Sequence, residues 1–230
     1  MNNSVGNAGR LLWAGLRALL VLTVVLGVIY PLVVTGIAQL AFPGKANGSE
    51  IKDASGRVVG SELIGQAYKD LKWFQPRPSN GLGTNSVNTQ YKIILSGATN
   101  RSGDNGALTD KNGKAYCPEK PEEGTLCAQV MDAKAAVVKD NSVAGYTVKP
   151  EDVPADAVTS SGSGLDPHIS PEYAELQVHR VAELNHLTVA QVAKLVADHT
   201  DGRILGFVGE PRVNVLQLNI ALKALVAAKG

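Results

Sequence analysis

The chain has 230 residues, enough for one compact domain of ordinary size and an additional element. Its formal net charge is +1 and no long run of like charge occurs, which excludes bulk binding of nucleic acid through a basic surface. Apolar residues make up 44% of the sequence but aromatic residues only 5%, so a core must be built mainly from Val, Leu, Ile and Ala.

The N-terminal region concentrates the apolar residues. The 25 residues from Ala18 to Phe42 carry no charge. A helix of that length measures roughly 37 Å and spans a hydrocarbon core of about 30 Å, and membrane helices tolerate a proline such as Pro31. The alternative is a cleaved signal peptide, whose apolar region would be about 7–15 residues long. We expect a short cytoplasmic tail at 1–17 and a retained transmembrane helix at 18–42.

The remaining residues, 43–230, are expected to form one extracytoplasmic domain. The basic residues around the span do not decide its orientation, but a long C-terminal part can be translocated largely regardless of charge. The only two cysteines, Cys117 and Cys127, lie ten apart in a polar segment. Such a pair suits a disulfide in an oxidising compartment, which would add roughly 3 kcal/mol in the chain-entropy model. Two free thiols are the alternative.

The first half of this domain contains many turn-forming residues. The segment 56–68 has short apolar pieces interrupted by Gly and predicts one or two strands. Trp73 and Phe74 are expected to fold over the core. A loop-rich insertion is expected at about 97–130, with hairpin turns where Asn precedes Gly, at 104–106 and 111–113.

The C-terminal third is more regular. Ser170 is a natural N-cap for a helix that ends near Asn185, and Thr188 is the N-cap of a second helix. A turn at 199–203 and a strand at 203–209 are expected to follow, and then a final amphipathic helix at 213–228. The expected buried positions of the first two helices are Tyr173, Leu176, Val181, Leu184, Val189, Val192, Leu195 and Val196. These elements predict an α+β extracytoplasmic domain on a single N-terminal transmembrane helix.

The loop at 160–171, "SSGSGLDPHISP", raises the question of a phosphate site. A Gly-rich loop before a helix offers backbone N–H groups and a favourable dipole to an anion. The loop has no Lys or Arg, however, and Asp166 would repel a phosphate. The alternative is a tight turn in which Asp166 and Ser170 accept hydrogen bonds from nearby N–H groups. No Walker A sequence, nucleophile elbow or metal-ligand spacing occurs, so we predict no catalytic residue and no metal site.

Five segments resemble, in order, the C subunit of the Kdp potassium-transporting ATPase, a bacterial high-affinity potassium pump. They are "GVIYPLVVTGIAQLAFPGKANGS", "GSELIGQ", "RPS" at 77–79, "VPADAVTSSGSGLDPHISPEYAELQVHRVA" and "GEPRVNVLQLNIAL". The resemblance covers nearly the whole chain but is weak from about Gly81 to Tyr146, where both cysteines lie.

The resemblance implies a non-catalytic, single-pass subunit of the bacterial inner membrane that is needed for assembly and coupling. Its implied partners are a channel-like potassium-binding subunit, a P-type ATPase subunit and a very small fourth subunit. The family is described as a catalytic chaperone that raises the ATP affinity of the ATPase subunit. ATP is the only cofactor that this implies, and the nucleotide positions would be Ser161, Gly162, Ser163, Gly164 and Gln177.

An extracytoplasmic domain conflicts with direct contact to cytosolic ATP. Coupling would then run through the membrane helix or through a conformational bias on the channel-like subunit. The domain could also shape potassium access at the outer mouth. Two other hypotheses remain open at this point: a regulator that binds nucleotide directly, and an unrelated membrane-anchored extracytoplasmic module.

Overall fold

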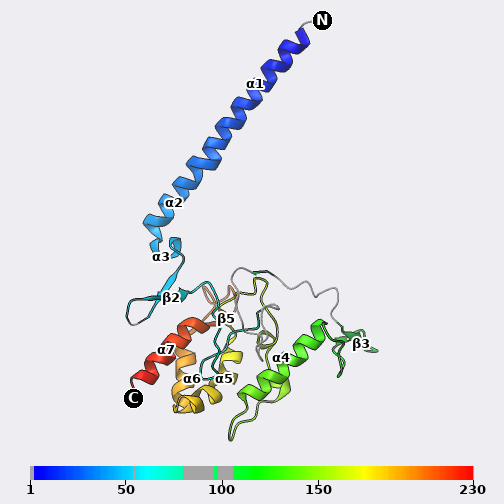
Figure 1. Cartoon of the computed structure of the whole chain (residues 1–230), viewed down its shortest axis with the longest axis vertical. Helices are drawn as coiled ribbons and strands as arrows, with labels where there is room; N and C mark the ends of the chain where they lie inside the picture. The colour runs from blue at the N-terminus through cyan, green and yellow to red at the C-terminus, as the bar shows by residue number, and fades with distance from the viewer. Residues whose placement is uncertain (1–2, 54, 80–95, 98–105, 230) are drawn as a thin grey trace. The chain divides into compact units, whose positions relative to one another are not determined.

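The computed structural model describes residues 3–53, 55–79, 96–97 and 106–229. The chain divides into two compact units, Met1–Glu50 and Ile51–Gly230 (Figure 1).

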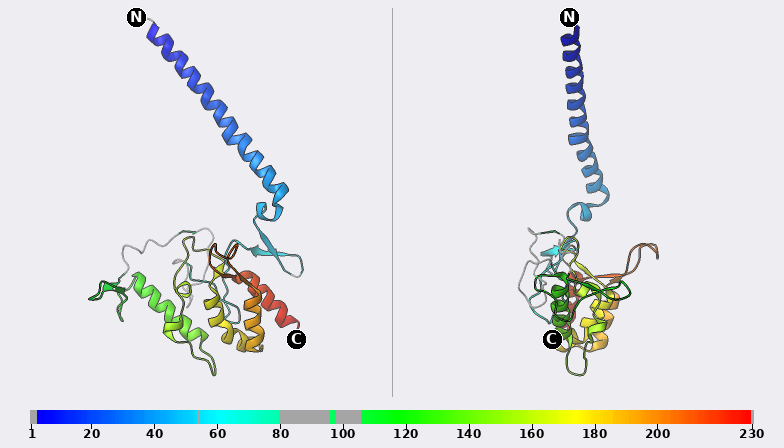
Figure 2. Two further views of the ribbon diagram at one scale, coloured as in Figure 1. Left: turned by 180° about the vertical axis from the view of Figure 1, so that it is seen from behind. Right: turned by 90° about the vertical axis from the view of Figure 1, so that its right-hand side faces the viewer.

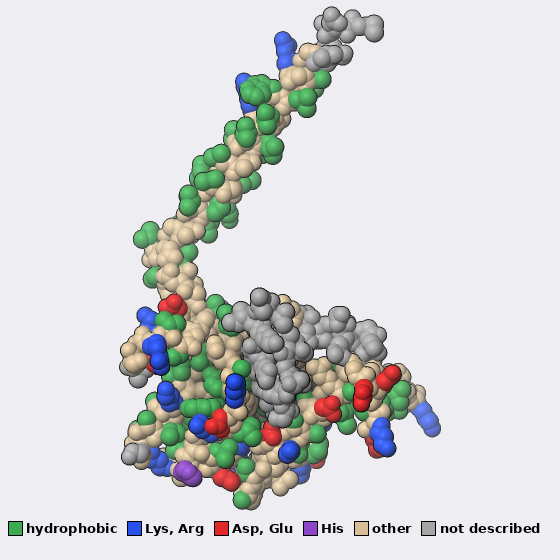
Figure 3. Space-filling view, in the orientation of Figure 1, with side chains coloured by type: hydrophobic (Ala, Val, Ile, Leu, Met, Phe, Trp, Pro, Cys, Tyr) green, Lys and Arg blue, Asp and Glu red, His purple; other side chains and the backbone are tan. Residues whose placement is uncertain are grey.

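The first unit is dominated by one long apolar helix. α1 (Asn3–Val24), the π-helical η1 (Val25–Ile29) and α2 (Tyr30–Ala41) follow one another without a break. The stretch Gly6–Ala41 is 36 residues long and apolar enough to cross a membrane. Hydrophobic side chains lie along it, and Lys and Arg occur only near its N-terminal end (Figure 3). The helix therefore begins well before Ala18, where the uncharged run starts.

The π-helical turn has an identifiable cause in Pro31. Proline has no N–H, and its ring would clash with the carbonyl four residues earlier, that of Gly27. η1 contains Gly27 and ends two residues before Pro31, so the wider turn accommodates the ring within a continuous helix. The helix ends at Phe42, and the short α3 (Pro43–Ala46) follows.

The second unit contains short antiparallel strands. β1 (Glu50–Lys52) pairs with β2 (Val58–Ser61), β3 (Leu108–Thr109) pairs with β4 (Ala115–Tyr116), and β5 (His168–Ile169), β7 (Arg212–Asn214) and β6 (Thr200–Asp201) form a three-stranded sheet in that order. The predicted strand within 56–68 is β2. The predicted turn at 111–113 connects β3 to β4, and the Asp110 carboxylate accepts the N–H groups of Asn112 and Lys114 at 2.8 Å. The turn predicted at 104–106 lies largely outside the described residues.

The helices of this unit confirm the α+β prediction. They are α4 (Leu126–Asn141), the 3-10 turns η4 (Pro150–Asp152) and η5 (Ala155–Ala157), α5 (Pro171–Leu184), α6 (Val189–Asp198) and α7 (Val215–Ala227). α4 begins inside the predicted loop-rich insertion at 97–130. Thr125 caps its start by accepting the Ala128 N–H at 3.2 Å. Cys117 and Cys127 form a disulfide, which joins the end of the β3–β4 hairpin to the first turn of α4.

The predicted ends of α5 and the predicted start of α6 are confirmed, whereas the last helix begins at Val215, after β7, and not at Val213. Ser170 accepts the Tyr173 N–H at 3.1 Å, Asn185 is the C-cap of α5, and Thr188 forms a capping box with Gln191. Two predicted core positions, Leu184 and Val189, are wrong, since both are exposed. They are the last residue of α5 and the first of α6, and the turn between the helices buries Leu187 instead.

The predicted strand at 203–209 is also wrong. The strand β6 lies earlier, at the predicted turn, and 203–209 forms the end of a hairpin in which Ile204 and Val208 make one isolated bridge. Leu205 and Gly206 have positive φ values of 54° and 81°, which are incompatible with an extended strand.

The core lies between the helices. α5 packs against α4 and α6, and α6 packs against α7. Val, Leu and Ala supply most of the buried side chains, together with Phe74 and Tyr173. Phe74 is fully buried and Trp73 packs partly buried against the core, as predicted.

Candidate functional site

The segment 73–79 is bound to the helices by two buried side-chain amides. Asn219 of α7 accepts the Phe74 N–H and donates to the Phe74 carbonyl, both at 2.9 Å. Gln177 of α5 does the same for Gln75, accepting at 2.7 Å and donating at 3.1 Å. Each amide satisfies both backbone groups of one residue, as a neighbouring strand would. The segment is therefore fixed to α5 and α7 without belonging to a sheet.

Arg180 completes this buried network. It is only 1% exposed and donates to the Asn141 side chain, the Trp73 carbonyl and the Gln177 amide oxygen at 2.8, 3.0 and 2.7 Å. Burial lowers the pKa of Arg180 to about 10, although nearby acidic groups, among them Asp140, oppose this shift. The guanidinium is therefore still charged at neutral pH, and it connects α4, α5 and segment 73–79.

The Gly-rich loop is fastened to the other end of the same segment. Arg77 forms an ion pair with Asp166 at 3.2 Å and donates to the carbonyls of Thr159 and Ser160 at 3.3 and 3.4 Å. The buried Ser79 hydroxyl donates to the Gly164 carbonyl at 3.0 Å. Residues 77–79 thus bind the loop through an ion pair and through hydrogen bonds to its backbone carbonyls.

Side chains of the loop itself occupy several of its N–H groups. The Ser161 hydroxyl accepts the Asp166 N–H at 3.3 Å, and the Ser163 hydroxyl accepts the Leu165 N–H at 3.1 Å. Asp166 in turn accepts the His168 N–H at 3.0 Å. A phosphate held by this loop would need such N–H groups. The alternative prediction, a tight turn with Asp166 and Ser170 bonded to nearby N–H groups, is confirmed.

The Asp166 carboxylate is kept ionised by its neighbours. Burial alone would raise its pKa, but hydrogen bonds from His168 and the charges of His168 and Arg77 outweigh burial and lower the pKa. His168 Nδ1 lies 3.2 Å from Oδ1 of Asp166, while Arg77 binds Oδ2. The carboxylate is therefore shared between Arg77 and His168 and has the character of a structural link.

These segments border a polar groove with a volume of about 530 Å³. Its lining residues are Arg77, Ala155, Asp156, Asp166, His168, Ile169, Ser170, Glu210, Pro211 and Arg212. β5 pairs with β7, and the Val215 N–H donates to the Pro167 carbonyl at 3.0 Å, which brings the C-terminal segment beside the loop. Three segments that are far apart in sequence, 77–79, 153–182 and 209–222, therefore meet at one surface.

The acidic residues of this groove already have partners. Asp156 accepts both the N–H and the hydroxyl of Ser170, at 2.7 and 2.8 Å, and Glu210 pairs with Arg203 at 2.6 Å. Among the residues that the structure describes, no group of three or more His, Cys, Asp or Glu side chains could hold a metal ion. The acidic side chains of the groove therefore contribute to its shape and polarity through contacts within the domain.

The predicted nucleotide residues fall into two places. Ser161, Gly162, Ser163 and Gly164 lie together in the loop, where the Ser161 and Ser163 hydroxyls are 3.3 Å apart. Gln177 is fully buried, and its hydrogen bonds go to Gln75 and Arg180.

No role was predicted from the sequence for Arg77, Arg180 or Asn219. A signal was present, because Gln177, Arg180 and Asn219 are polar residues on faces of helices that are otherwise apolar.

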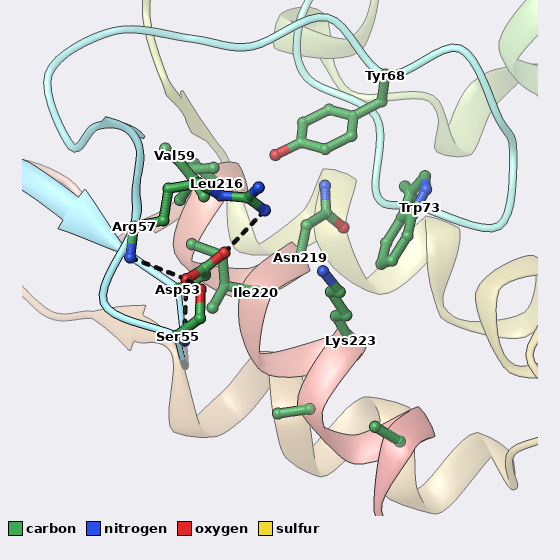
Figure 4. Close-up of a pocket in the computed structure, with 12 residues that line it drawn as sticks. Asp53, Ser55, Arg57, Val59, Tyr68, Trp73, Leu216, Asn219, Ile220 and Lys223 are labelled. Atoms are coloured by element: carbon green, nitrogen blue, oxygen red, sulfur yellow. Dashed lines mark hydrogen bonds and ion pairs between the residues drawn. The ribbon is translucent and has the colours of Figure 1, made fainter. Parts of the chain in front are cut away.

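A second, mainly apolar groove of about 520 Å³ runs along α7. In Figure 4, Leu216, Ile220 and Lys223 of α7 lie between the turn that contains Asp53 and the side chains of Tyr68 and Trp73. Asp53 pairs with Arg57 at 3.2 Å. A hydrogen bond from the Ser55 hydroxyl is the largest of the effects that lower the pKa of Asp53 to about 2. The groove thus has apolar walls and one charged rim.

The sequence comparisons show the family to which the chain belongs. The model of the family KdpC, "K+-transporting ATPase, c chain", matches residues 12–224. The chain belongs to the KdpC family. Proteins with the name "Potassium-transporting ATPase KdpC subunit" include one from Streptomyces avermitilis that is 68% identical over 99% of both chains. Those from Streptomyces coelicolor and Mycobacterium tuberculosis are 64% and 41% identical, over 99% and 94% of this chain and 98% and 99% of their own. The resemblance read from five segments is thereby confirmed.

Proposed function

We propose that this chain is an accessory, non-catalytic subunit of an ATP-driven potassium-uptake complex. The observation that carries the proposal is that the polar groups of its KdpC-like segments are used to brace the fold. Arg77, Asp166, Gln177 and Arg180 all bind groups within the domain. The result is a fixed surface on a membrane anchor, which suits a protein that holds or biases other subunits. The proposed partners are a channel-like potassium-binding subunit, a P-type ATPase subunit and a small fourth subunit.

We further propose that the anchor crosses the inner membrane once and that the domain lies outside the cytoplasm. The apolar helix Gly6–Ala41 supports the anchor, and the Cys117–Cys127 disulfide supports an oxidising compartment. An external domain meets no cytosolic nucleotide. Any increase in the ATP affinity of the ATPase subunit would then be a coupling free energy transmitted through the anchor or the channel-like subunit. Shaping of potassium access at the outer mouth is compatible with the same placement.

Labelling of a single new thiol tests the location. The native cysteines are bonded to each other, so Lys111→Cys in the exposed β3–β4 turn would supply one free thiol. A membrane-impermeant maleimide should label it in intact protoplasts, while Asn7→Cys in the N-terminal tail should react only in inside-out vesicles. The reverse pattern would overturn the external placement.

Co-purification tests membership of the complex. The tagged full-length chain, extracted in mild detergent, should bring down the ATPase and channel-like subunits together with potassium-stimulated ATP hydrolysis. If no such subunits accompany it, the proposed accessory role is wrong.

Direct nucleotide binding is the competing function, and photo-crosslinking tests it. A photoreactive ATP analogue added to the whole complex should label the ATPase subunit and leave this chain unlabelled. A crosslink to this chain that disappears in Ser161→Ala and Ser163→Ala would favour the direct regulator. Gln177 is unsuitable for this test, because its replacement should disturb the core.

A further inference from the structure

The hairpin between β6 and β7 ends in an apolar tip, which we define as residues 204–208, Ile-Leu-Gly-Phe-Val. Leu205 is 83% exposed and Phe207 is 75% exposed, and Ile204 and Val208 are exposed as well. In the right-hand view of Figure 2 this hairpin, between α6 and α7 in the colour sequence, projects from the body of the domain. Four such side chains present several hundred Å² of apolar surface, comparable to the largest patch of a typical monomer, roughly 300–600 Å². Such a largest patch is often functional, so the apolar tip is a candidate interaction surface.

The backbone of the apolar tip gives a second, independent indication. Leu205 has φ of 54°, in the left-handed region that disfavours residues with a Cβ atom. An exposed turn position with such a φ normally carries Gly, Asn or Asp. In the domain alone, neither burial nor backbone preference favours leucine here. Burial of the Leu205 side chain against a partner would supply a favourable free energy that offsets the unfavourable φ.

The apolar tip is held in a defined shape. Ile204 and Val208 exchange two backbone hydrogen bonds at 2.9 and 3.0 Å, and Arg203 pairs with Glu210 at 2.6 Å directly behind them. The strand β7 continues into the fully buried Val213. The hairpin is therefore fastened to the core, and a shape fixed in advance reduces the ordering cost of binding.

The charges and side-chain types indicate what kind of partner fits. Residues 200–213 carry two acidic groups, Asp201 and Glu210, and two basic groups, Arg203 and Arg212, so their net charge is zero. They contain no Trp or Tyr. A loop that enters a lipid interface typically combines apolar residues with Trp or Tyr and an excess of Lys and Arg. These residues therefore favour a protein surface over a membrane.

We propose that the apolar tip inserts into an apolar pocket on another subunit of the potassium-transporting ATPase complex, with Phe207 and Leu205 as its principal anchors. The polar groove begins directly behind the tip, because Glu210, Pro211 and Arg212 line it. An apolar centre with a polar, charge-paired rim is the usual anatomy of a protein interface. This inference rests on the proposed accessory function, since it requires the other subunits to be present.

Site-specific photo-crosslinking in the purified complex tests the contact. Phe207 is replaced by p-benzoylphenylalanine in the full-length chain, and Leu184, an exposed leucine at the end of α5, is replaced in the same way as the control. Light should join the chain to one identified subunit of the complex from position 207 but not from position 184. An adduct with lipid only, or no adduct while the subunits still co-purify, would overturn the inference and leave the proposed function intact. Absence of the other subunits from the wild-type preparation would overturn both.

Two substitutions separate binding from folding. Phe207→Ala should lower the fraction of partner subunits retained in stringent detergent at least tenfold, as truncation of an aromatic anchor commonly does. Leu205→Asn should also weaken retention, while its unfolding temperature stays equal to or above that of the wild type because asparagine tolerates this φ. Leu184→Asn should leave retention unchanged. Wild-type retention in both tip variants would show that the apolar tip is not the contact.

Discussion

Replacement of Gln177 tests whether this residue serves the fold. Its amide is fully buried and makes three hydrogen bonds, two with the Gln75 backbone and one with Arg180. Gln177→Met keeps most of the side-chain volume but leaves a buried N–H, a buried carbonyl and one guanidinium donor unsatisfied. At about 1–3 kcal/mol for each group, and with partial relaxation, we expect a loss of about 3–6 kcal/mol.

A loss of that size should be easy to measure. For a chain of this length, 1 kcal/mol corresponds to about 2–4 °C, so the unfolding temperature of Gln177→Met should fall by roughly 10–20 °C. The unfolding temperature of Gln177→Ala should fall further, because this substitution also leaves a cavity. The full-length protein in detergent can be followed by tryptophan fluorescence, since Trp73 packs against the core beside this network.

The matched control is Glu175→Ala, on the exposed face of the same helix. It should change the stability by no more than about 0.5 kcal/mol. The reasoning is refuted if Gln177→Met unfolds within about 2 °C of the wild type, because the three hydrogen bonds would then contribute nothing measurable. Loss of ATP crosslinking to this chain with unchanged stability would instead assign Gln177 to a nucleotide.

Three further predictions concern other parts of the molecule. Cys117→Ser combined with Cys127→Ser should lower the free energy of unfolding by about 3 kcal/mol, measured by denaturant unfolding, and reduction of the wild type should have the same effect. Asp166→Asn should lower the unfolding temperature at pH 7. Because the folded-state pKa of Asp166 is lowered, its contribution is present above about pH 3.9 and is lost as the pH falls through the folded value, so the variant and the wild type should converge at acidic pH once the carboxylate of the folded wild type is protonated. Leu26→Arg should cost about 2.5–3.5 kcal/mol on the insertion scale and reduce the carbonate-resistant membrane fraction, whereas Asn7→Arg should not.

Local signals in the sequence were sufficient for much of the fold. The N-caps Ser170 and Thr188 and the C-cap Asn185 were predicted correctly, because a cap depends on side chains within three or four residues. The hairpin turn at 111–113 followed from the same local chemistry. The helix α4 was missed because its N-cap, Thr125, follows a Pro- and Gly-rich stretch and the apolar periodicity of the helix is weak.

Errors in the predicted structure arose where contacts between residues distant in sequence determine the backbone conformation or the burial of a side chain. The segment 203–209 has the β-branched and aromatic composition of a strand, but Leu205 and Gly206 adopt positive φ and turn the chain back. Burial of Leu184 and Val189 followed from helical spacing alone, which does not show where the contact between two helices ends. The sequence pattern gives the side of a helix that faces the core but not the length of that contact.

The interpretation of the Gly-rich loop changed most, and contacts distant in sequence explain why. From its own residues, "SSGSGLDPHISP" could have been either a phosphate loop or a turn. The structure shows a turn that Arg77 and Ser79 bind across more than 80 residues, and in which the Ser161 and Ser163 hydroxyls accept two of the loop's own N–H groups. Several donors and acceptors of the loop are thus paired within the domain. The apolar tip extends from the same face through Glu210 and Arg212. The apolar tip is the exposed, protruding part of this surface, and this supports the proposed contact with a protein partner.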